Sequence, residues 1–360
     1  MRTRSRGVGL AGAGVAVAAV VLALVLPAGP AGAAGSTYRR TNLVSDVPGR
    51  AQVTDPNLVN AWGLSYGPGT PVWVADNGTG KSTLYAGGVH GSTETVTPLV
   101  VTIPGGAPTG TVFNPTSGFA VHNGAASGPA TFLFVSESGH LTGWSASSSG
   151  TSAQDAVLRK GAVWKGLALG RPAAGPRLYA ANFSAGRIDV FDSAFHPVAT
   201  AGMFRDPNLP AHYAPFNVMV AGSRLYVSYA KRAGGGPDEV DGAGLGRVDV
   251  YTLGGRLLHR VRHHGKLDAP WGMTIAPAGF GRFSGDLLVG NFGDGRIHAF
   301  GARTLGGRGT VRNAAGHPIR IDGLWALTPG NGTEGGKDQV LFSAGPNDES
   351  HGLLGVLSLR

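Results

Sequence analysis

One short pattern of strands recurs six times along this chain at nearly even spacing, and it constrains the fold more than any other feature. Each copy holds an apolar strand opened by a bulky or small residue, a second strand that ends in a small polar turn, and a third strand. The clearest copy runs through 269–273, 287–293 and 295–300. Equivalent positions in the first strands, spaced by 47, 56, 51, 55 and 54 residues, are Gly63, Gly110, Gly166, Asn217, Gly272 and Ala326. Repeats of this length with several short strands each predict an all-β fold, a six-bladed β-propeller.

The limits of the copies predict blades that follow one another directly. We expect the six blades at 61–103, 108–162, 165–204, 215–263, 270–312 and from 323 onward. The sixth copy supplies one strand fewer than the others, and an extra strand, 38–44, precedes the first copy. Because an open ring would leave unpaired strand edges, we expect 38–44 to pair as the outer strand of the sixth blade and to close the ring.

The first 33 residues have the composition of a signal peptide. Arg2, Arg4 and Arg6 form a positive start, 8–26 is an uncharged apolar run, and 31–33 offers small residues for cleavage. A membrane anchor is the alternative, because about 19 apolar residues just reach across a bilayer. We expect cleavage, which leaves 34–360 as a single secreted, extracellular propeller domain without a stable membrane span. The chain contains no cysteine, so this domain has no disulfides.

Charge narrows the range of partners. The formal net charge is +9, but the lysines and arginines are scattered along the chain. A nucleic-acid-binding surface would instead show them clustered and interleaved with aromatic residues. We therefore expect a monomer with a cell-wall, glycan or protein ligand, and no nucleic-acid partner.

Two resemblances to known families rest on longer phrases of the sequence. The segments 178–182 and 186–191 together resemble the NHL repeat, and 72–85 and 287–300 look similar. Phrases that resemble an uncharacterised family of secreted bacterial β-propeller proteins lie at 54–63, 206–210, 269–272, 284–295, 321–327 and 344–352. This second resemblance spans roughly residues 38–357. It implies the propeller fold and export, and it implies no substrate.

Acidic and amide side chains recur after the second strand of several blades, where they would surround one end of the channel. The candidate metal ligands of this kind are Asn77, Glu137, Asn182 and Asn291. Oxygen-rich rings hold calcium or other divalent cations, as they do in six-bladed propellers of the gluconolactonase and regucalcin type. The alternative is that each side chain bonds only to its own turn.

Two further polar groups are candidate ligand-binding residues. Two Asp-Pro-Asn-Leu turns, which precede the inner strands of the opposite blades one and four, supply Asp55, Asn57, Asp206 and Asn208. A loop of blade six, the densest polar segment of the chain, supplies Asn347, Asp348, Glu349 and His351. Loops often hold binding residues, but turn chemistry also accounts for both groups. The glycine-rich insertion 231–246 in blade four is expected to be mobile and solvated.

The sequence lacks the motifs of nucleophilic catalysis. It contains no Gly-x-Ser-x-Gly, no His-Glu-x-x-His and no cysteine. The favoured hypothesis is therefore an extracellular binding or scaffold module that uses one face of the ring. The alternative is a metal-assisted lactonase, hydrolase or lyase with its site at the channel, whereas a quinone-dependent sugar dehydrogenase has no residue that supports it. Propellers host all of these functions, so the fold does not choose among them.

Overall fold

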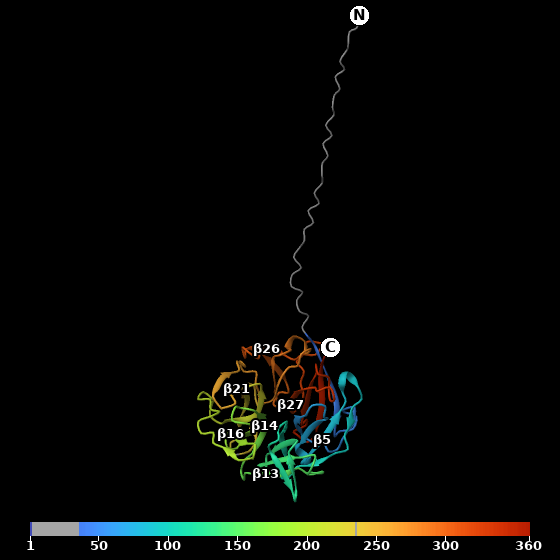
Figure 1. Ribbon diagram of the computed structural model, residues 1–360. Helices are drawn as coiled ribbons and strands as arrows, with labels where there is room; N and C mark the ends of the chain where they lie inside the picture. The colour runs from blue at the N-terminus through green and yellow to red at the C-terminus, as the bar shows by residue number, and fades with distance from the viewer. Residues whose placement is uncertain (2–35, 235) are drawn as a thin grey trace. The chain divides into compact units, whose positions relative to one another are not determined.

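Six mostly antiparallel sheets follow one another around a central channel in the computed structural model, which describes Met1 and residues 36–234 and 236–360 (Figure 1). Each sheet is one blade; in blades one to five the first strand in chain order lies innermost, and in blade six the strand Leu324–Pro329 does. Each inner strand contacts the inner strands of both neighbouring blades, and β27 (Leu324–Pro329) of blade six contacts β3 (Ala61–Ser65) of blade one. The ring is therefore closed, and the six-bladed β-propeller is confirmed. Apart from Met1, the predicted signal peptide lies outside the described residues.

Blades one to three match the limits expected from the repeats. Blade one consists of β3, β4 (Val72–Asp76), β5 (Lys81–Ala86), β6 (Thr95–Val96) and β7 (Val101–Thr102). Blade two consists of β8 (Pro108–Phe113), β11 (Phe132–Ser136), β12 (His140–Trp144) and β13 (Gln154–Leu158). Blade three consists of β14 (Trp164–Gly170), β15 (Arg177–Asn182), β16 (Arg187–Asp192) and β17 (Pro197–Val198). A separate hairpin, β9 (Ala120–Asn123) and β10 (Ala126–Pro129), was not expected, because its mostly exposed residues carry no core pattern.

Blades four to six complete the ring. Blade four consists of β18 (Tyr213–Ala221), β19 (Arg224–Arg232), β20 (Glu239–Val240), β21 (Gly246–Thr252) and β22 (Leu257–Arg260). Blade five consists of β23 (Pro270–Ile275), β24 (Leu287–Asn291), β25 (Ile297–Phe300) and β26 (Gly307–Thr310). Blade six consists of β27, β28 (Val340–Ala344), β29 (Leu353–Leu359), β1 (Tyr38–Ser45) and β2 (Val53–Thr54). Three short 3₁₀ turns are η1 (Asn77–Thr79), η2 (Val89–Gly91) and η3 (Gly281–Phe283). No helix among the described residues is long and apolar enough to cross a membrane.

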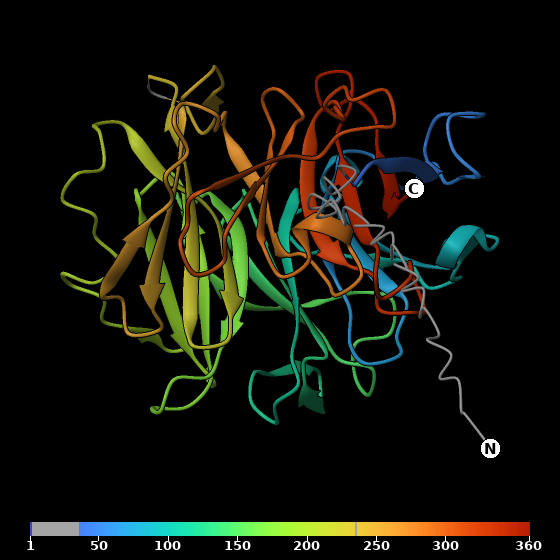
Figure 2. The ribbon, with the colours of Figure 1, turned by 90° about the horizontal axis from the view of Figure 1, so that it is seen from above.

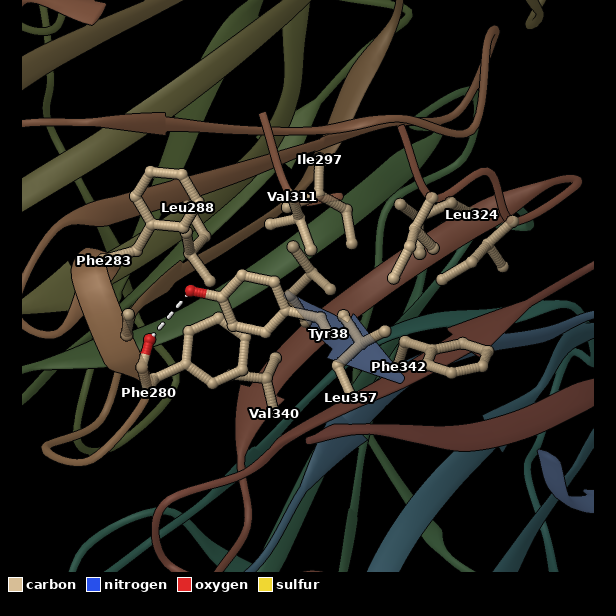
Figure 3. Close-up of a cluster of buried hydrophobic side chains, with 14 of the residues drawn as sticks. Tyr38, Phe280, Phe283, Leu288, Ile297, Val311, Leu324, Val340, Phe342 and Leu357 are labelled. Atoms are coloured by element: carbon tan, nitrogen blue, oxygen red, sulfur yellow. Dashed lines mark hydrogen bonds between the residues drawn. The ribbon is translucent and has the colours of Figure 1, made fainter. Parts of the chain in front are cut away.

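The strand β1 closes the ring as expected, by pairing with the last strand of the chain. It runs antiparallel to β29 from the pair Tyr38–Leu359 to the pair Ser45–Leu353 (Figure 2). Its first residue lies between blades five and six, where the Tyr38 hydroxyl donates to the carbonyl oxygen of Phe280 at 2.9 Å (Figure 3). The far end of β1 buries Leu43 and Val44 between blades six and one. The strand thus joins the two ends of the chain and also packs against both neighbouring blades.

Glycines in the inner strands allow neighbouring strands to approach closely around the channel. A side-chain carbon added at Gly110 would lie 2.4 Å from the backbone nitrogen of Leu167, and one added at Gly63 would lie 2.4 Å from the carbonyl oxygen of Thr109. A side-chain carbon added at Gly272 would lie 2.6 Å from the carbonyl oxygen of Trp325. The repeated glycine of the sequence pattern therefore marks contact between blades, in addition to its usual role in turns.

The substitution Gly110→Ala is expected to destabilise the ring by about 1–3 kcal/mol or more, because the added carbon meets backbone that cannot rotate away. Urea denaturation followed by tryptophan fluorescence measures this change. Gly307→Ala is the matched control, since Gly307 lies in the exposed outer strand β26 with no atom within 4 Å of the added carbon. Equal stability of the two variants would contradict the close approach of β8 and β14.

Candidate functional site

Side chains from five blades meet at the end of the channel where the inner strands begin. In an antiparallel blade the start of the first strand lies beside the end of the second strand. Residues that precede or open the inner strands therefore gather with residues that follow the second strands. We name this group the channel mouth, and its members are Asn60, Asn77, Glu137, Lys165, Glu239 and Glu349.

Lys165 lies at the centre of the channel mouth. It is the second residue of the inner strand β14, and its side chain is only 3% exposed. Its Nζ lies 2.9 Å from Oε2 of Glu239 and 3.3 Å from Oε1 of Glu137. The same nitrogen lies between 5.3 and 5.6 Å from the ring centroids of three aromatic side chains, which are Trp62, Phe183 and Phe216. The ammonium group is thus held between carboxylates on one side and aromatic faces on the other, an arrangement that favours a cation.

The electrostatics of the channel mouth keep Lys165 charged and leave an excess of carboxyl groups. Burial opposes the charge of Lys165, but the carboxylates of Glu239 and Glu137 outweigh burial and raise its pKa. Burial raises the pKa of Glu239, and the attraction of Lys165 offsets only part of that rise. One ammonium group therefore serves several carboxyl groups, so the channel mouth has acidic character.

Two asparagines connect Glu349 to this ion pair. The Asn60 amide nitrogen donates to Oε2 of Glu349 at 2.6 Å and to Oδ1 of Asn77 at 3.2 Å. The Asn77 amide nitrogen donates to Oε2 of Glu137 at 3.1 Å. The orientation of the Asn60 amide is fixed, because the indole nitrogen of Trp325 donates to its oxygen at 2.8 Å. Hydrogen bonds and ion pairs thus form a continuous chain from Glu349 to Glu239.

Glu349 is a carboxyl group of the channel mouth whose pKa is raised toward neutrality. Burial, followed by the nearby charge of Glu239, raises its pKa to about 7. Its loop has an unusual backbone, since Asn347, Asp348 and Glu349 have φ angles of 58°, 51° and 62°. Three successive non-glycine residues in the left-handed region are strained. The contact of the Asn347 backbone nitrogen with Oδ2 of Asp322, at 2.9 Å, holds this turn so that Glu349 points to Asn60.

The aromatic residues that open the inner strands form the floor of the channel mouth. The rings of Trp62 and Trp325 lie 3.9 Å apart between centroids, and Trp271 lies about as far from both, at 6.2 and 5.9 Å. The indole nitrogen of Trp271 donates to the carbonyl oxygen of Lys165 at 2.8 Å. These rings are buried, so they support the polar residues above them and are not free for a ligand to stack on.

The four candidate metal ligands divide into two sets. Asn77 and Glu137 contact each other in the channel mouth. The Asn182 amide donates to Asp189 at 2.7 Å, and the Asn291 amide donates to the carbonyl oxygen of Lys266 at 2.9 Å. These last two side chains therefore satisfy contacts within their own blades and turns instead of joining the first two. Among the described residues, no group of three or more histidine, aspartate and glutamate side chains is placed to hold a metal ion.

The two Asp-Pro-Asn turns have the same local geometry. Oδ1 of Asp55 accepts the backbone nitrogen of Asn57 at 2.9 Å, and Oδ1 of Asp206 accepts that of Asn208 at 2.8 Å. The second oxygen of Asp55 accepts the Tyr85 hydroxyl, at 2.9 Å. Asp206 also forms an ion pair with the Arg260 guanidinium. Both aspartates thus fix turns and anchor neighbouring strands, and the structure places them outside the channel mouth.

The polar loop of blade six sends only one of its candidate residues into the channel mouth. Glu349 reaches Asn60, whereas Asn347 and Asp348 are exposed. His351 pairs through Nδ1 with Oδ2 of Asp46, at 2.8 Å. This histidine therefore ties the loop to the segment after β1.

Sequence reasoning missed Asn60, Lys165 and Glu239 as members of the channel mouth. A signal for Lys165 was present, because the same inner-strand position is aromatic in four of the other five blades, and only blade two has a threonine there. The four aromatic residues are Trp62, Phe216, Trp271 and Trp325. Glu239 lies in the insertion expected to be mobile and solvated, and that expectation was wrong for this residue. The pairing of β20 with β19 and the bond to Lys165 bury its side chain, which is 7% exposed.

Comparison with known proteins places the chain among viral relatives. No family model matches the chain. It is 33% identical over 348 residues to uncharacterized protein R648 of Acanthamoeba polyphaga mimivirus, covering 93% of this chain and 83% of that protein. It is also 31% identical over 347 residues to uncharacterized protein L690 of the same virus, covering 92% and 88%. The chain belongs to the family of these two proteins. The relatives are viral, so bacterial secretion and the NHL-like character of the repeats stay predictions.

Solved structures with similar folds include an enzyme and a protein complex. The virginiamycin B lyase of Staphylococcus aureus aligns with a TM-score of 0.47 at 10% identity, covering 90% of this chain and 100% of that one. A chain of the nidogen/laminin complex aligns with a TM-score of 0.46 at 13% identity, covering 77% and 87%.

The opposite end of the channel differs from the channel mouth. A cavity of about 410 Å³ opens there, lined by the later residues of the inner strands, which include Leu64, Val112, Leu169, Met273 and Leu327. Its walls are largely apolar. The two ends of the channel therefore present different chemistry: no ionisable side chain lines this cavity, whereas carboxyl groups and an ammonium group lie at the channel mouth.

Proposed function

We propose that this protein is an exported binding module whose channel mouth takes a glycan that carries free amino groups. The observation that carries the proposal is that Glu137, Glu239 and Glu349 gather around one ammonium group, that of Lys165. The carboxyl groups outnumber the cation, so the site attracts positive charge. The Lys165 ammonium lies within hydrogen-bond or ion-pair distance of Glu137 and Glu239, which is the geometry that a ligand's amino group would adopt beside these carboxylates.

Access from solvent supports the same proposal. The Glu137 side chain is 27% exposed, so its carboxylate is open to a ligand while it contacts Lys165. Asn77, which is partly buried, offers an amide beside it. Carboxylate and amide groups side by side suit a ligand that presents both amino and hydroxyl donors, as an amino sugar does.

Binding to glucosamine oligomers tests the proposal, with N-acetylglucosamine oligomers of equal length as the uncharged control. Calorimetry should show binding of the free-amine oligomer that weakens as salt rises, and much weaker binding of the acetylated one. Glu137→Gln should weaken binding by about ten- to a hundredfold, since a hydrogen bond to a charged group contributes about 1.5–3 kcal/mol.

Asp155→Asn is the matched control variant, because this exposed aspartate of blade two pairs with His140 away from the channel mouth. It should bind the glucosamine oligomer as the unaltered protein does. Equal binding of charged and acetylated oligomers, or no binding of either, would contradict the proposal. Binding of a lysine-rich peptide in place of both sugars would also contradict the glycan as ligand.

A catalytic function is the second candidate, and the raised pKa of Glu349 favours it. A carboxyl group with a pKa of about 7 suits a general acid or base that acts near neutral pH. The same oligomer mixtures, analysed for cleavage products, separate an enzyme from a binding module. Cleavage that depends on Glu349 would establish the enzyme, and intact oligomers would support binding alone.

A further inference from the structure

The end of the channel opposite the channel mouth carries six apolar or aromatic side chains, one from each blade. Each stands three residues after the position that defines the sequence repeat, at or near the end of its inner strand. All six are partly exposed. We name this group the apolar collar, and its members are Tyr66, Phe113, Leu169, Val220, Ile275 and Pro329. Apolar side chains that stay open at the same point of every blade form a patch of the kind that marks a ligand-binding groove or an interface.

Two adjoining cavities lie beside the apolar collar. The first is the cavity of about 410 Å³ at the end of the channel, and collar residues of blades three to six line it. The second, of about 500 Å³, is lined mainly by blades one to three. The two cavities share the lining residues Leu64, Thr111, Val112, Leu169, Val220 and Thr328. Together they can hold one ligand, and their volumes and apolar walls are typical of small-molecule sites, which measure about 300–1,000 Å³.

A single charged residue, Arg171, lines the two cavities. It directly follows β14, and its Nη2 donates to the carbonyl oxygen of Pro115, a second lining residue, at 3.1 Å. In the part of the chain that the structure describes, Arg171 forms no ion pair. The bond to Pro115 thus holds the guanidinium at the second cavity and leaves its other N–H groups for a ligand. A guanidinium of this kind suits a carboxylate, which it can bind through two parallel hydrogen bonds.

The rest of the cavity walls offer a ligand few polar partners. Asn217 is the one amide side chain among the lining residues of both cavities. Its nitrogen donates to the carbonyl oxygen of Trp271 at 2.8 Å, and its oxygen accepts the backbone nitrogen of Val218 at 2.7 Å. A sugar would leave many hydroxyl groups without partners in such a site, and that is costly. A hydrocarbon chain needs no partners and gains from leaving water.

We propose that the two cavities bind a fatty acid, with its carboxylate on Arg171 and its acyl chain against the apolar collar. The apolar walls account for the chain, and the lone guanidinium accounts for one anionic head group. One charge beside a cavity of this size suits a small amphipathic anion better than a protein surface. The site shares no residue with the channel mouth and does not depend on the ligand proposed there.

Calorimetry with hexanoate, octanoate and decanoate, each below the concentration at which it forms micelles, tests the proposal. The affinity should rise about tenfold for each two added CH₂ groups while the cavities have room. Decanol, which has the same chain without the charge, should bind about ten- to a hundredfold more weakly than decanoate. Ala221→Phe, which narrows the first cavity, should weaken the binding of decanoate more than that of hexanoate.

Arg171→Gln separates the head group from the chain. It should weaken the binding of decanoate by about ten- to a hundredfold and leave the binding of decanol unchanged. Arg256→Gln is the matched control, because this exposed arginine lies in the turn between β21 and β22 and lines neither cavity. It should bind both ligands as the unaltered protein does.

The unaltered protein alone decides the proposal if a variant does not fold. No binding of the three acids, or equal affinities for all three, would overturn it. Equal binding of decanoate by Arg171→Gln and the unaltered protein would also overturn it, because the head group would then lie elsewhere. A dimer in size-exclusion chromatography that decanoate does not dissociate would assign the apolar collar to a second copy of the chain instead. Glucosamine oligomers should not compete with decanoate, so the failure of one proposal leaves the other standing.

Discussion

Replacement of Lys165 by methionine is expected to lower the free energy of unfolding by about 3–5 kcal/mol, the usual result of removing one partner of a buried ion pair. Methionine keeps an unbranched apolar side chain of similar length over the aromatic floor. The loss therefore comes from the charge, because Glu239 stays buried and Glu137 loses its cation. Chemical denaturation at pH 8 measures the change.

Two further variants and a second pH distinguish loss of the ion pair from a general effect of the substitution. Lys160→Met changes an exposed lysine in the turn that precedes β14, and it should have little effect. Adding Glu239→Gln to Lys165→Met should recover part of the loss, since the uncompensated carboxylate is then gone. The loss should also be smaller at pH 5 than at pH 8: without Lys165 the folded pKa of Glu239 rises further, and stability falls as pH increases from the ordinary carboxyl range through that pKa. Equal losses for Lys160→Met and Lys165→Met would contradict the described ion pair.

Removal of residues 36–45, which form the closing strand β1 and the two residues before it, is expected to prevent a stable monomeric ring. The deletion exposes the edge of β29 and removes three buried hydrophobic side chains, Tyr38, Leu43 and Val44. Each such side chain contributes about 1.5–3 kcal/mol by burial, and an unpaired strand edge favours association between chains. Size-exclusion chromatography and thermal melting should show aggregation or a strongly lowered melting temperature.

A synthetic peptide of residues 36–45 provides the control, because a strand added in trans can pair with an open edge. It should restore the melting temperature of the shortened protein. A peptide with Tyr38, Leu43 and Val44 changed to alanine should not restore it. Arg39→Ala and Arg40→Ala, at exposed positions of the same strand, should leave the full protein stable. A shortened protein that melts like the intact one would show that β1 does not close the ring.

The sequence predicts the fold well because the repeated residues follow from the close approach of neighbouring inner strands, which recurs around the ring. The glycines at the start of β3, β8 and β23 recur where inner strands come within contact distance of one another. The missing strand of the sixth copy and the extra strand before the first copy together predict the pairing of β1 with β29. The hairpin of β9 and β10 escapes this reasoning, because it belongs to one blade only and buries little.

The channel mouth is harder to predict, because its residues meet only after the ring has closed. Asn182 and Asn291 pair opposite the inner strands where Asp76 does in blade one, one residue before the position of Asn77 and Glu137. Their amides donate to Asp189 and to the carbonyl oxygen of Lys266. A shift of one residue therefore separates the side chains that reach the channel mouth from those that stay beside their own strands. The sequence gives a signal for Lys165, because a lysine stands where most other blades have an aromatic residue. No such signal marks Glu239, since its place depends on the pairing of a two-residue strand within a glycine-rich insertion.

A crystal structure of the protein with a bound glucosamine oligomer tests the central claim most directly. The account predicts an amino group of the sugar within hydrogen-bond distance of the Glu137 carboxylate, with the Lys165 ammonium still paired to Glu239 below it. An oligomer bound at the apolar end of the channel, or Glu137 and Glu239 turned away from Lys165, would contradict it.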